Sequence, residues 1–438
     1  MGKLVISASQ FQSQVTDLLP CNKGRKSQLV YELLNCYSLL DQFDHVIAKP
    51  CCDKRELLRF HSESYINAVL DSKYDRLLPY DEDESSWSQL LEMTNDWSHR
   101  NDAQIATYWN TRTQLYEYFK GLTSRKRPAA EIEDVEKQRE TDYKSFNLEG
   151  DCPIFSFLPM YCQVVTGATL RLADYIELDS HDDRTIAINW DGGRHHAMKK
   201  KASGFCYVND IVLLIQKLRS KGFQKLTYVD FDLHHGDGVE RAFQFSPKIQ
   251  TISMHLFECG FFPTTGSLED NKRGKNIANI PLAHGLDDAY LNEIVTKVVI
   301  PLIDRHFPQA IIVQCGGDGL MGDEYNEWQL TIRGLCENIL KIVNNYKDCP
   351  IVLLGGGGYN ATVMSRFYTY LTGKLIYPDF LQDEDIIIPE HRFIDAYHDE
   401  HYKFWAYEME GSLLKKTLKN ENKPEFINKV RNHYGICT

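Results

Sequence analysis

The chain has no uninterrupted apolar run that approaches the ~20 residues a helix needs to span a bilayer. Its first ten residues, MGKLVISASQ, also lack the basic and then apolar pattern of a signal peptide. The fourth residue after Gly2 is Ile6 rather than Ser or Thr, so the myristoylation motif is incomplete. We therefore expect a soluble protein that is not secreted, has no lipid anchor and has no membrane among its partners.

Cysteine pairs and excess basic charge are also missing, which excludes further classes of protein. None of the twelve cysteines forms a Cys-x-x-Cys pair, which favours neither a zinc knuckle nor a disulfide framework and fits a reducing compartment. The formal net charge of -12 argues against a nucleic-acid backbone as a direct partner. The same charge suits a cationic substrate such as a lysine-rich tail.

From Asp151 onward, the chain repeats a short β-branched run, a polar or glycine-rich loop and an amphipathic stretch. This pattern is typical of an α/β protein with a central, mostly parallel sheet flanked by helices. In such proteins the active site lies at the carboxyl ends of the strands. The predicted strands here are residues 185–189, 225–232, 249–254, 310–314 and 351–354.

Helices are predicted between these strands and in the N-terminal part. One helix is expected at 209–220, with Asn209 or Asp210 as its N-cap. The others are expected at 287–306, 326–346, 26–41 and 61–70, and a further strand is expected at 4–7.

We expect the whole chain to form one domain that is interrupted by a charged insertion at 71–144. The insertion is predicted to be partly helical around 87–97 and mobile around 122–142. Its basic cluster at 125–128 is either a nuclear import signal or, as is usual for such clusters, solvated surface. Residues 375–438 are expected to form a C-terminal extension that packs on the domain or trails it.

The predicted strand in YVDFDLHHGDG, residues 228–238, carries ionisable side chains. Because side chains alternate along a strand, Asp230, Asp232 and His234 project from one face and the apolar residues between them from the other. Burying that face without a cation would cost several kcal/mol per ionised carboxylate. The apolar flanks favour a metal site, although an isolated Asp-x-Asp-x-His can also end a strand in an exposed loop.

A second predicted strand, at 310–314, runs into glycines that end at Asp318. With Asp232 and His234, this carboxylate would complete a three-ligand zinc site. Such a site keeps an open position, which a catalytic zinc requires for water and substrate.

The segment NWDGGRHHA, residues 189–197, places tandem histidines after a strand and a glycine turn. Adjacent His195 and His196 point in different directions and need separate partners, for which Asp230 and Asp237 are available. A carboxylate that accepts a hydrogen bond from Nδ1 fixes the tautomer and raises the basicity of the ring. The pattern predicts a general base beside a metal site, whereas a single buried histidine would more often be structural.

The segment IVLLGGGGYN, residues 351–360, ends a buried strand in four glycines and Tyr359. No Gly-Lys-Ser or Gly-Lys-Thr follows, which excludes a phosphate-binding loop. Glycines also let the backbone pass close to a site, and Tyr359 could then donate its hydroxyl to a developing oxyanion opposite the zinc. The alternative is a tyrosine in a tight turn.

Five segments together resemble the signatures of the class I zinc-dependent histone deacetylases: HHAMKKKASGFCYVND, YVDFDLHHGDGVE, GFFPTTG, QCGGDG and LLGGGGYN. The resemblance covers about 151–370 and, more loosely, 4–70. Within the family, the chain looks most like the budding-yeast Hos-branch deacetylase that acts on cohesin. The resemblance implies the arginase-like fold and a protein lysine deacetylase, which hydrolyses N6-acetyl-lysine to acetate and lysine.

The resemblance also implies catalytic and metal-binding roles. One zinc ion would be bound by Asp232, His234 and Asp318. Tyr359 would polarise the acetyl carbonyl. Protons would be handled by His195 and His196, paired with Asp230 and Asp237, and His196 would be the principal base and acid.

Further roles are implied for the substrate and for a second ion. The residues that would contact the substrate are Asp151 at the rim, Phe205 and Phe262 in the tunnel walls, and Gly204 and Gly357. A structural potassium ion would be held, partly through carbonyls, by Asp230, Asp232, His234, Ser253 and Met254.

The chain departs from the family pattern at several positions. The sequence from Pro263 to Gly266 is Pro-Thr-Thr-Gly rather than the usual Pro-Gly-Thr-Gly, and Arg194 stands where an apolar or aromatic residue is common. The rim shape and substrate preference therefore stay open. Corepressor-bound class I enzymes place arginines for inositol phosphate where this sequence has Glu324 and Thr362, so we expect no such site.

Two other functions compete with a deacetylase. An arginase-type or acetylpolyamine amidohydrolase with two manganese ions would need further metal-spaced acids, and the chain offers one Asp-x-His set. An inactive scaffold that binds acetyl-lysine would need an obstructed tunnel, since every expected catalytic residue is present. The expected substrates are acetylated histones or the acetylated SMC subunit of cohesin, in the nucleus and/or cytoplasm. The sequence chooses neither between these substrates nor between zinc and ferrous iron.

Overall fold

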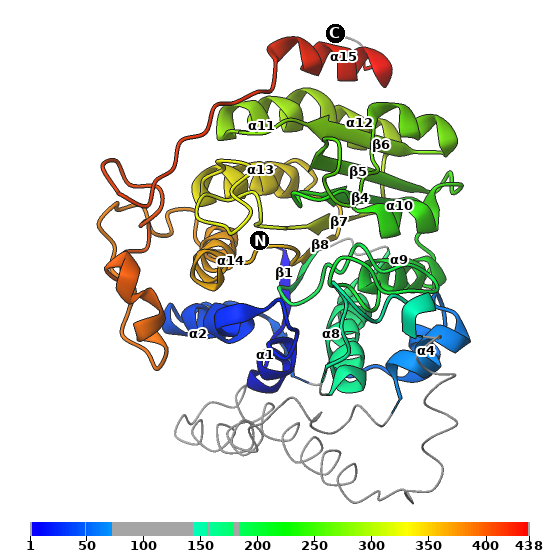
Figure 1. The fold of residues 1–438 in the computed structure, drawn as a ribbon, viewed down its shortest axis with the longest axis horizontal. Helices are drawn as coiled ribbons and strands as arrows, with labels where there is room; N and C mark the ends of the chain where they lie inside the picture. Colours follow the sequence, from blue (N-terminus) through cyan, green and yellow to red (C-terminus); the bar gives the residue numbers. More distant parts are fainter. Residues whose placement is uncertain (1, 49, 72–142, 156, 179–183, 437–438) are drawn as a thin grey trace, which may run out of the picture.

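The computed structural model describes all residues except 1, 49, 72–142, 156, 179–183 and 437–438 (Figure 1). Nearly all of the predicted insertion at 71–144 lies outside the described residues, including its expected helix and its basic cluster. Among the described residues, no helix is both long and apolar enough to span a membrane.

One sheet forms the centre of the described chain, and all of its neighbouring strands are parallel (Figure 1). Its strand order is β2-β1-β3-β8-β7-β4-β5-β6. This arrangement confirms the predicted α/β architecture. The strands are β1 (Lys3–Ser7), β2 (His45–Ile47), β3 (Thr185–Asn189), β4 (Leu226–Asp230), β5 (Ile249–Leu256), β6 (Ile277–Leu282), β7 (Ala310–Gln314) and β8 (Ile351–Leu354).

Helices cover both faces of the sheet. The helices α2, α11, α12, α13 and α14 contribute to the largest hydrophobic cluster, on one face, whereas α8 and α9 pack on the other. The helices are α1 (Gln10–Thr16), α2 (Lys26–Cys36), α3 (Lys54–Leu57), α4 (Glu63–Val69), α8 (Leu158–Leu172), α9 (Asp210–Ser220), α10 (Asp237–Phe243), α11 (Asp288–Ile294), α12 (Ile300–His306), α13 (Ile332–Asn345), α14 (Ala361–Ile376) and α15 (Pro424–His433).

The alternation predicted for the segment that includes β4 is present. Val229 and Phe231 are buried in the cluster with α2 and α14, whereas Tyr228 is buried in the cluster with α9. Asp230 follows the same alternation as Tyr228, whose hydroxyl donates to Asp230 Oδ2 at 2.7 Å. The ionisable face is therefore buried rather than exposed to solvent.

Three of the predicted strands, 185–189, 310–314 and 351–354, have the observed bounds. The prediction at 225–232 was too long, because β4 ends at Asp230, whose Oδ1 accepts a hydrogen bond from the Asp232 N–H. Strand β5 extends two residues beyond its predicted end at 254. Strand β6 was not predicted. It contains Pro281, which cannot donate to a neighbouring strand and is tolerated because β6 lies at the sheet edge.

Helix bounds were less predictable. The helix predicted at 26–41 ends at Cys36, and Ser38 has a φ of 52°. The helix predicted at 326–346 begins only at Ile332, because Thr331 caps it by accepting a hydrogen bond from the Gly334 N–H. Asn209 caps α9, as expected.

The helix predicted at 287–306 is continuous but changes its hydrogen bonding in the middle. Asp287 caps α11, and a π-helical turn, Val295–Val299, joins it to α12. Pro301 has no N–H to donate to Lys297, which is a physical reason for the altered turn.

The chain after α14 packs against the helices that cover one face of the sheet. Ile388, Tyr397 and Trp405 are buried in the largest hydrophobic cluster, and α15 adds Ile427 and Val430 to it. Figure 1 shows this C-terminal segment, coloured orange to red, beside α2 and α14 and then across α11.

Candidate active site

Four central strands place the chemically rich segments side by side. The strands β3, β8, β7 and β4 are consecutive in the sheet, and each is followed by one of the segments singled out in the sequence. Because all four strands are parallel, these segments meet at one edge of the sheet.

Asp232, His234 and Asp318 converge at this edge, and each is at least 97% buried. One donor atom from each side chain lies within 4.8 Å of the other two. His234 Nδ1 is 3.0 Å from Asp318 Oδ2 and 3.3 Å from Asp232 Oδ1. Burial and the neighbouring Asp232 raise the pKa of Asp318, so the two carboxylates are difficult to ionise together without a cation.

These separations fit a zinc ion. With bonds of about 2.0–2.2 Å in a tetrahedral site, two ligand atoms lie roughly 3.3–3.6 Å apart. The remaining oxygens of both carboxylates are already held, since Asp232 Oδ2 accepts from Gln314 Nε2 and Asp318 Oδ1 accepts from the Leu233 N–H. Such outer bonds orient metal ligands and leave one oxygen of each carboxylate for the ion.

Gly357 brings the loop after β8 directly against this ligand set. Its N–H donates to Asp232 Oδ2 at 2.8 Å. A Cβ at this position would lie 2.2 Å from Asp318 Oδ2, well inside van der Waals contact. The close approach accounts for a glycine here, as the sequence predicted.

The tandem histidines are buried and separately partnered, as their adjacency suggested. His195 Nδ1 is 2.8 Å from Asp230 Oδ2, and His196 Nδ1 is 2.8 Å from Asp237 Oδ1. The Nε2 atom of His195 is 3.8 Å from Asp232 Oδ1.

Although their partners are alike, the two rings differ in basicity. Burial opposes charge on His195, but Asp230 and Asp232 outweigh it and raise the pKa to about 9. Burial and the charge of His195 lower the pKa of His196 to about 4, despite Asp237. At neutral pH the pair therefore combines a cationic ring and a neutral ring that can accept a proton.

Tyr359 faces the same site from the loop after β8. Its N–H donates to Asp323 Oδ2 at 2.6 Å, which fixes the backbone. Burial and then the charge of Asp318 raise the pKa of Tyr359 well above its usual value, so its hydroxyl keeps its proton. Its ring meets Phe205 edge-on, with the centroids 5.8 Å apart.

A cavity of about 440 Å³ opens from this site to solvent, and Phe205, Tyr359 and Asp151 line it. Phe262 lies on the other side of His196, at 4.9 Å between ring centroids, and is 40% exposed. Asp151 Oδ2 accepts from the Gly204 N–H at 2.7 Å and so holds the turn that carries Phe205. Of the predicted substrate-contact residues, Asp151 and Phe205 line this cavity, whereas Gly204 and Gly357 line a smaller cavity next to it.

The residues predicted for potassium lie one layer deeper. Asp230 and Ser253 are paired across β4 and β5, and Met254 follows. Asp232 and His234 are buried and lie beyond the end of β4. Their backbone carbonyl oxygens accept no hydrogen bond from the described residues. Buried carbonyls of this kind are ligands that a hard cation accepts.

Sequence reasoning missed several supporting residues. Gln314 holds Asp232, and Asp323 holds Tyr359. Asp210 accepts from the N–H groups of Gly193 and Arg194, which fixes the loop before the histidines. Only one of these residues could have been found from the sequence: Gln314 is a polar residue at the end of an apolar strand.

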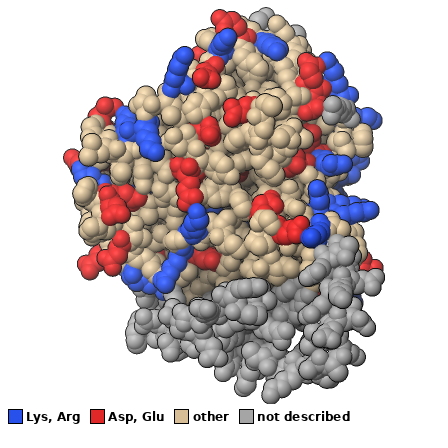
Figure 2. All heavy atoms as spheres, in the orientation of Figure 1, with Lys and Arg blue, Asp and Glu red and all other residues tan. Residues whose placement is uncertain are grey.

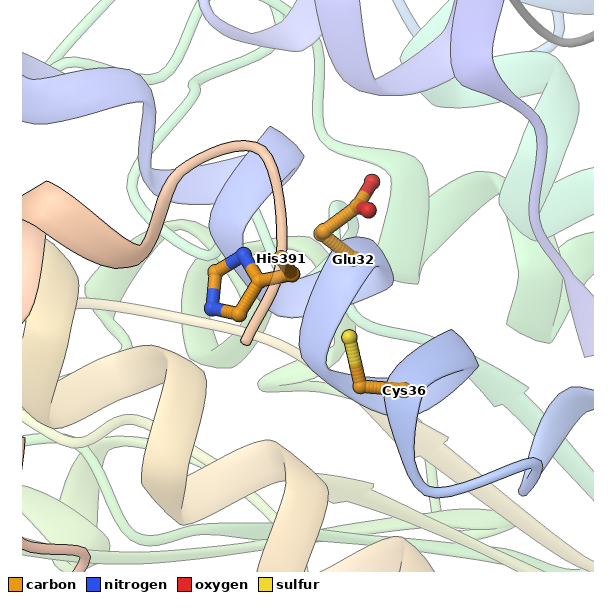
Figure 3. Close-up of side chains that lie close together, drawn as sticks. All are labelled: Glu32, Cys36 and His391. Carbon is orange, nitrogen blue, oxygen red and sulfur yellow. The ribbon is translucent and has the colours of Figure 1, made fainter. Parts of the chain in front are cut away.

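A second group of possible metal ligands lies elsewhere, where Glu32 and Cys36 on α2 approach His391 (Figure 3). Arg392 Nε is 3.0 Å from Glu32 Oε2, so this carboxylate already has a cationic partner. We interpret the group as a contact that joins the C-terminal segment to α2.

Comparison with known proteins finds similar chains along most of the sequence. The chain matches the family described as "Histone deacetylase domain" over residues 19–375. It is 49% identical to Histone deacetylase HOS1 of Saccharomyces cerevisiae over the full length of both chains. It is 36% identical to Histone deacetylase 1 of Homo sapiens, over 65% of this chain and 56% of that protein. It is also 36% identical to Type-1 histone deacetylase 1 of Dictyostelium discoideum, over 65% of this chain and 54% of that protein.

Proposed function

The chain belongs to the histone deacetylase family, whose members hydrolyse the amide of acetyl-lysine. We propose that the site at the carboxyl ends of β3, β8, β7 and β4 performs this reaction with one zinc ion. The predicted resemblance to the family and to its budding-yeast Hos branch is confirmed by the comparisons. The observation that carries the proposal is the buried Asp232–His234–Asp318 set beside two histidine–aspartate pairs and a protonated tyrosine.

The family is generally zinc-dependent, and the donor set here suits that metal. When bound, zinc supplies Lewis acidity toward the amide carbonyl and the attacking water. A potassium ion beside Asp230, Ser253 and Met254 would stabilise the loop that carries Asp232 and His234.

The protein's own residues supply the proton transfers and the oxyanion donor. His196 is neutral at pH 7 and accepts the proton of the attacking water, whereas the cationic His195 stabilises negative charge as it develops. Tyr359 donates its hydroxyl to the carbonyl oxygen. His196 then returns its proton to the departing lysine amine, which leaves acetate and free lysine.

The tunnel would position the acetyl-lysine side chain. Phe205, whose ring contacts Tyr359, and Phe262, whose ring contacts His196, would form its walls. Gly204 and Gly357 let the chain approach closely. Asp151 would accept hydrogen bonds from backbone N–H groups of the substrate. Its carboxylate can do so because the Gly204 N–H occupies only one of its acceptor positions.

We propose that the substrates are acetylated lysines of histones or of the SMC subunit of cohesin, in the nucleus and/or cytoplasm. The net charge of -12 and the carboxylates of Asp151 and Glu324 at the mouth favour lysine-rich peptides. On the face in Figure 2, described acidic and basic side chains are interspersed, which supports the absence of direct nucleic-acid binding. Glu324 pairs with Lys23, and Thr362 bonds Glu400, which supports the absence of an inositol phosphate site.

The deciding experiment compares wild-type protein with Tyr359→Phe. Bound zinc and iron are quantified, and acetate release is measured from acetyl-lysine peptides of histone tails and of the cohesin SMC subunit. We expect about one zinc per chain in both proteins and a loss of ~10²- to 10³-fold in kcat for the variant.

Tyr377→Phe is the matched control, because Tyr377 is the exposed tyrosine at the other end of α14. It should retain wild-type kcat. Zinc-loaded wild-type protein that releases no acetate from either peptide set would exclude the proposed function, and bound iron in place of zinc would correct the metal. The ratio of kcat/KM between the two peptide sets decides which substrate class is preferred.

A further inference from the structure

Resting on the proposed function, we propose that the same site also hydrolyses N6-acyl-lysines whose short acyl group ends in a carboxylate, malonyl-lysine above all. The observation is a small cavity on the inner side of the reaction site. Two buried cations, Lys26 and Arg194, line it.

The cavity continues the tunnel past the reacting groups. It shares Cys21, Phe205 and Tyr359 with the cavity that opens to solvent, and its walls include His195, His196 and Asp232. An acyl group whose carbonyl lies against Tyr359 and the zinc ligands therefore has its far end directed toward this cavity. Backbone rather than side chains forms much of the wall, at Gly193, Gly204, Gly356 and Gly357.

Lys26 reaches this cavity from the first turn of α2. It is only 7% exposed, and its Nζ donates to Gly358 O at 3.0 Å and more weakly to Gly356 O at 3.5 Å. Burial, and then the positive charge of Arg194, lowers the pKa of Lys26.

Arg194 reaches the cavity from the loop after β3 and is 8% exposed. One of its terminal nitrogens donates to Asp191 O at 3.0 Å. Its Nε is buried and has no hydrogen-bond partner among the described residues. Burying an N–H of a charged guanidinium without an acceptor is unfavourable, so an acceptor is expected in the space beside it.

No carboxylate within 4.0 Å neutralises either cation in the described part of the chain. The nearby buried carboxylates are committed elsewhere. Asp191 accepts from Ser27 and Gln12, and Asp210 accepts from Thr169 and from backbone N–H groups. A small anion is therefore the chemical complement of this cavity.

Size selects the anion. The cavity has a volume of about 20 Å³, which is room for one or two waters at roughly 10–15 Å³ each. A malonyl group is an acetyl group whose methyl carries a carboxylate, so it adds three heavy atoms at this place. Succinyl and glutaryl groups add one and two further methylenes and would fit progressively less well.

The reaction is the same hydrolysis. The oxygen of water forms a bond to the acyl carbon next to nitrogen, the carbon–nitrogen bond breaks, and the lysine amine takes a proton from His196. Malonate and free lysine are the products, and no oxidant or reductant is needed.

The test compares four acyl-lysine peptides of one sequence with zinc-loaded wild-type protein: acetyl, malonyl, succinyl and the monoamide of malonyl. The monoamide has the size of malonyl without its charge. We expect malonyl to be cleaved faster than its monoamide and faster than succinyl. In Lys26→Met and Arg194→Met, the ratio of kcat/KM for malonyl to that for acetyl should fall by about 10- to 100-fold.

The ratio within each variant corrects for any general loss of folded or zinc-loaded enzyme. Arg194→Lys keeps the charge and should retain part of the preference. Lys248→Met removes an exposed lysine outside the cavity and should leave the ratio unchanged.

The outcomes separate this inference from the proposed function. Cleavage of acetyl-lysine without cleavage of malonyl-lysine overturns the inference alone, whereas cleavage of neither overturns the proposed function. An unchanged ratio in both variants would show that the cavity is not the site. Inhibition by free malonate without cleavage of malonyl-lysine would mean that the cavity takes only free carboxylates, which also overturns the proposed activity.

Discussion

The two ends of the tunnel differ in how far their charged side chains are exposed to water. We call the open end, at Lys23 and Glu324, the mouth, and the inner cavity lined by Lys26 and Arg194 the foot. At the mouth, Lys23 and Glu324 form an ion pair of 3.1 Å with side chains that are 70% and 52% exposed. At the foot, Lys26 and Arg194 are 7% and 8% exposed and have no ion-pair partner in the described chain. Similar side chains thus sit in water at one end and in the protein interior at the other.

The difference indicates at which end a charged side chain is costly to keep and therefore hard to replace. An exposed ion pair contributes about 0–1 kcal/mol and is easily replaced. A buried charge costs several kcal/mol unless it is compensated. Of the two ends, it is the foot that holds buried charged groups, since Asp232 and Asp318 are also buried there. We therefore expect substitutions at the foot to have much larger effects than those at the mouth.

The largest effect is expected for Asp318→Asn, which removes the charge of a proposed zinc ligand at the foot. Zinc content should fall, and kcat/KM for an acetyl-lysine peptide should fall by more than ~10³-fold, because even outer partners of metal ligands cost 10- to 100-fold. Zinc per chain and peptide turnover are the measurements. Asp385→Asn, at an exposed carboxylate, is the control. Full activity of Asp318→Asn at normal zinc content would contradict the proposed site.

A smaller loss is expected for Gly357→Ala. The added Cβ would lie 2.2 Å from Asp318 Oδ2, so the loop or the ligand must move. We expect a fall of ~10²-fold in kcat/KM and weaker zinc binding, since a misplacement of about 1 Å costs this much. Gly411→Ala controls for the loss of a glycine outside the site: nothing lies within 4 Å of a Cβ there, and the strain at its φ of 76° should lower stability but leave kcat/KM unchanged. Wild-type turnover in Gly357→Ala would show that the loop can yield at no cost.

The grouping of the three proposed zinc ligands was predictable because each follows a recognisable strand. Asp232 and His234 belong to one alternating segment, and Asp318 ends another, so sequence alone indicated that they belong together. Their catalytic roles stay predictions. The strand order that makes β3, β8, β7 and β4 neighbours is a long-range property, and no local pattern encodes it.

Other features could not be predicted because their partners are distant or their patterns are hidden. Asp323 holds the N–H of Tyr359, 36 residues away, and nothing in its own segment shows this. Helices α8 and α14 were not predicted, because burial on nearly all sides leaves no polar stripe.

His61 is a buried histidine outside the tunnel, and its burial should make the stability of the protein depend on pH. This histidine is 3% exposed, its Nε2 accepts from the Asn209 N–H, and burial lowers its pKa to about 4. The unfolded chain takes up this proton near pH 6.5, so stability should fall as the pH drops through 6.5 and stop falling near 4.

Between pH 7 and pH 5, the contribution of His61 to this loss is about 2 kcal/mol. His61→Gln keeps an acceptor for Asn209 and removes the titration, so its stability should depend less on pH over this range. Urea unfolding of both proteins at pH 7 and pH 5 gives the comparison. Equal losses in both proteins would show that His61 does not titrate as its burial predicts.

The smallest effect is expected at the mouth. Lys23→Met and Glu324→Gln should each change the free energy of unfolding by less than about 1 kcal/mol, because water already screens their charges. The double variant should show coupling of the same small size, and 0.5 M salt should remove it. Peptide kcat should stay near that of wild type, whereas the association of lysine-rich peptides should weaken in Glu324→Gln as a mouth carboxylate is lost. A loss of activity comparable to that of Asp318→Asn would overturn the contrast between the two ends, since it would place a chemical constraint at the exposed one.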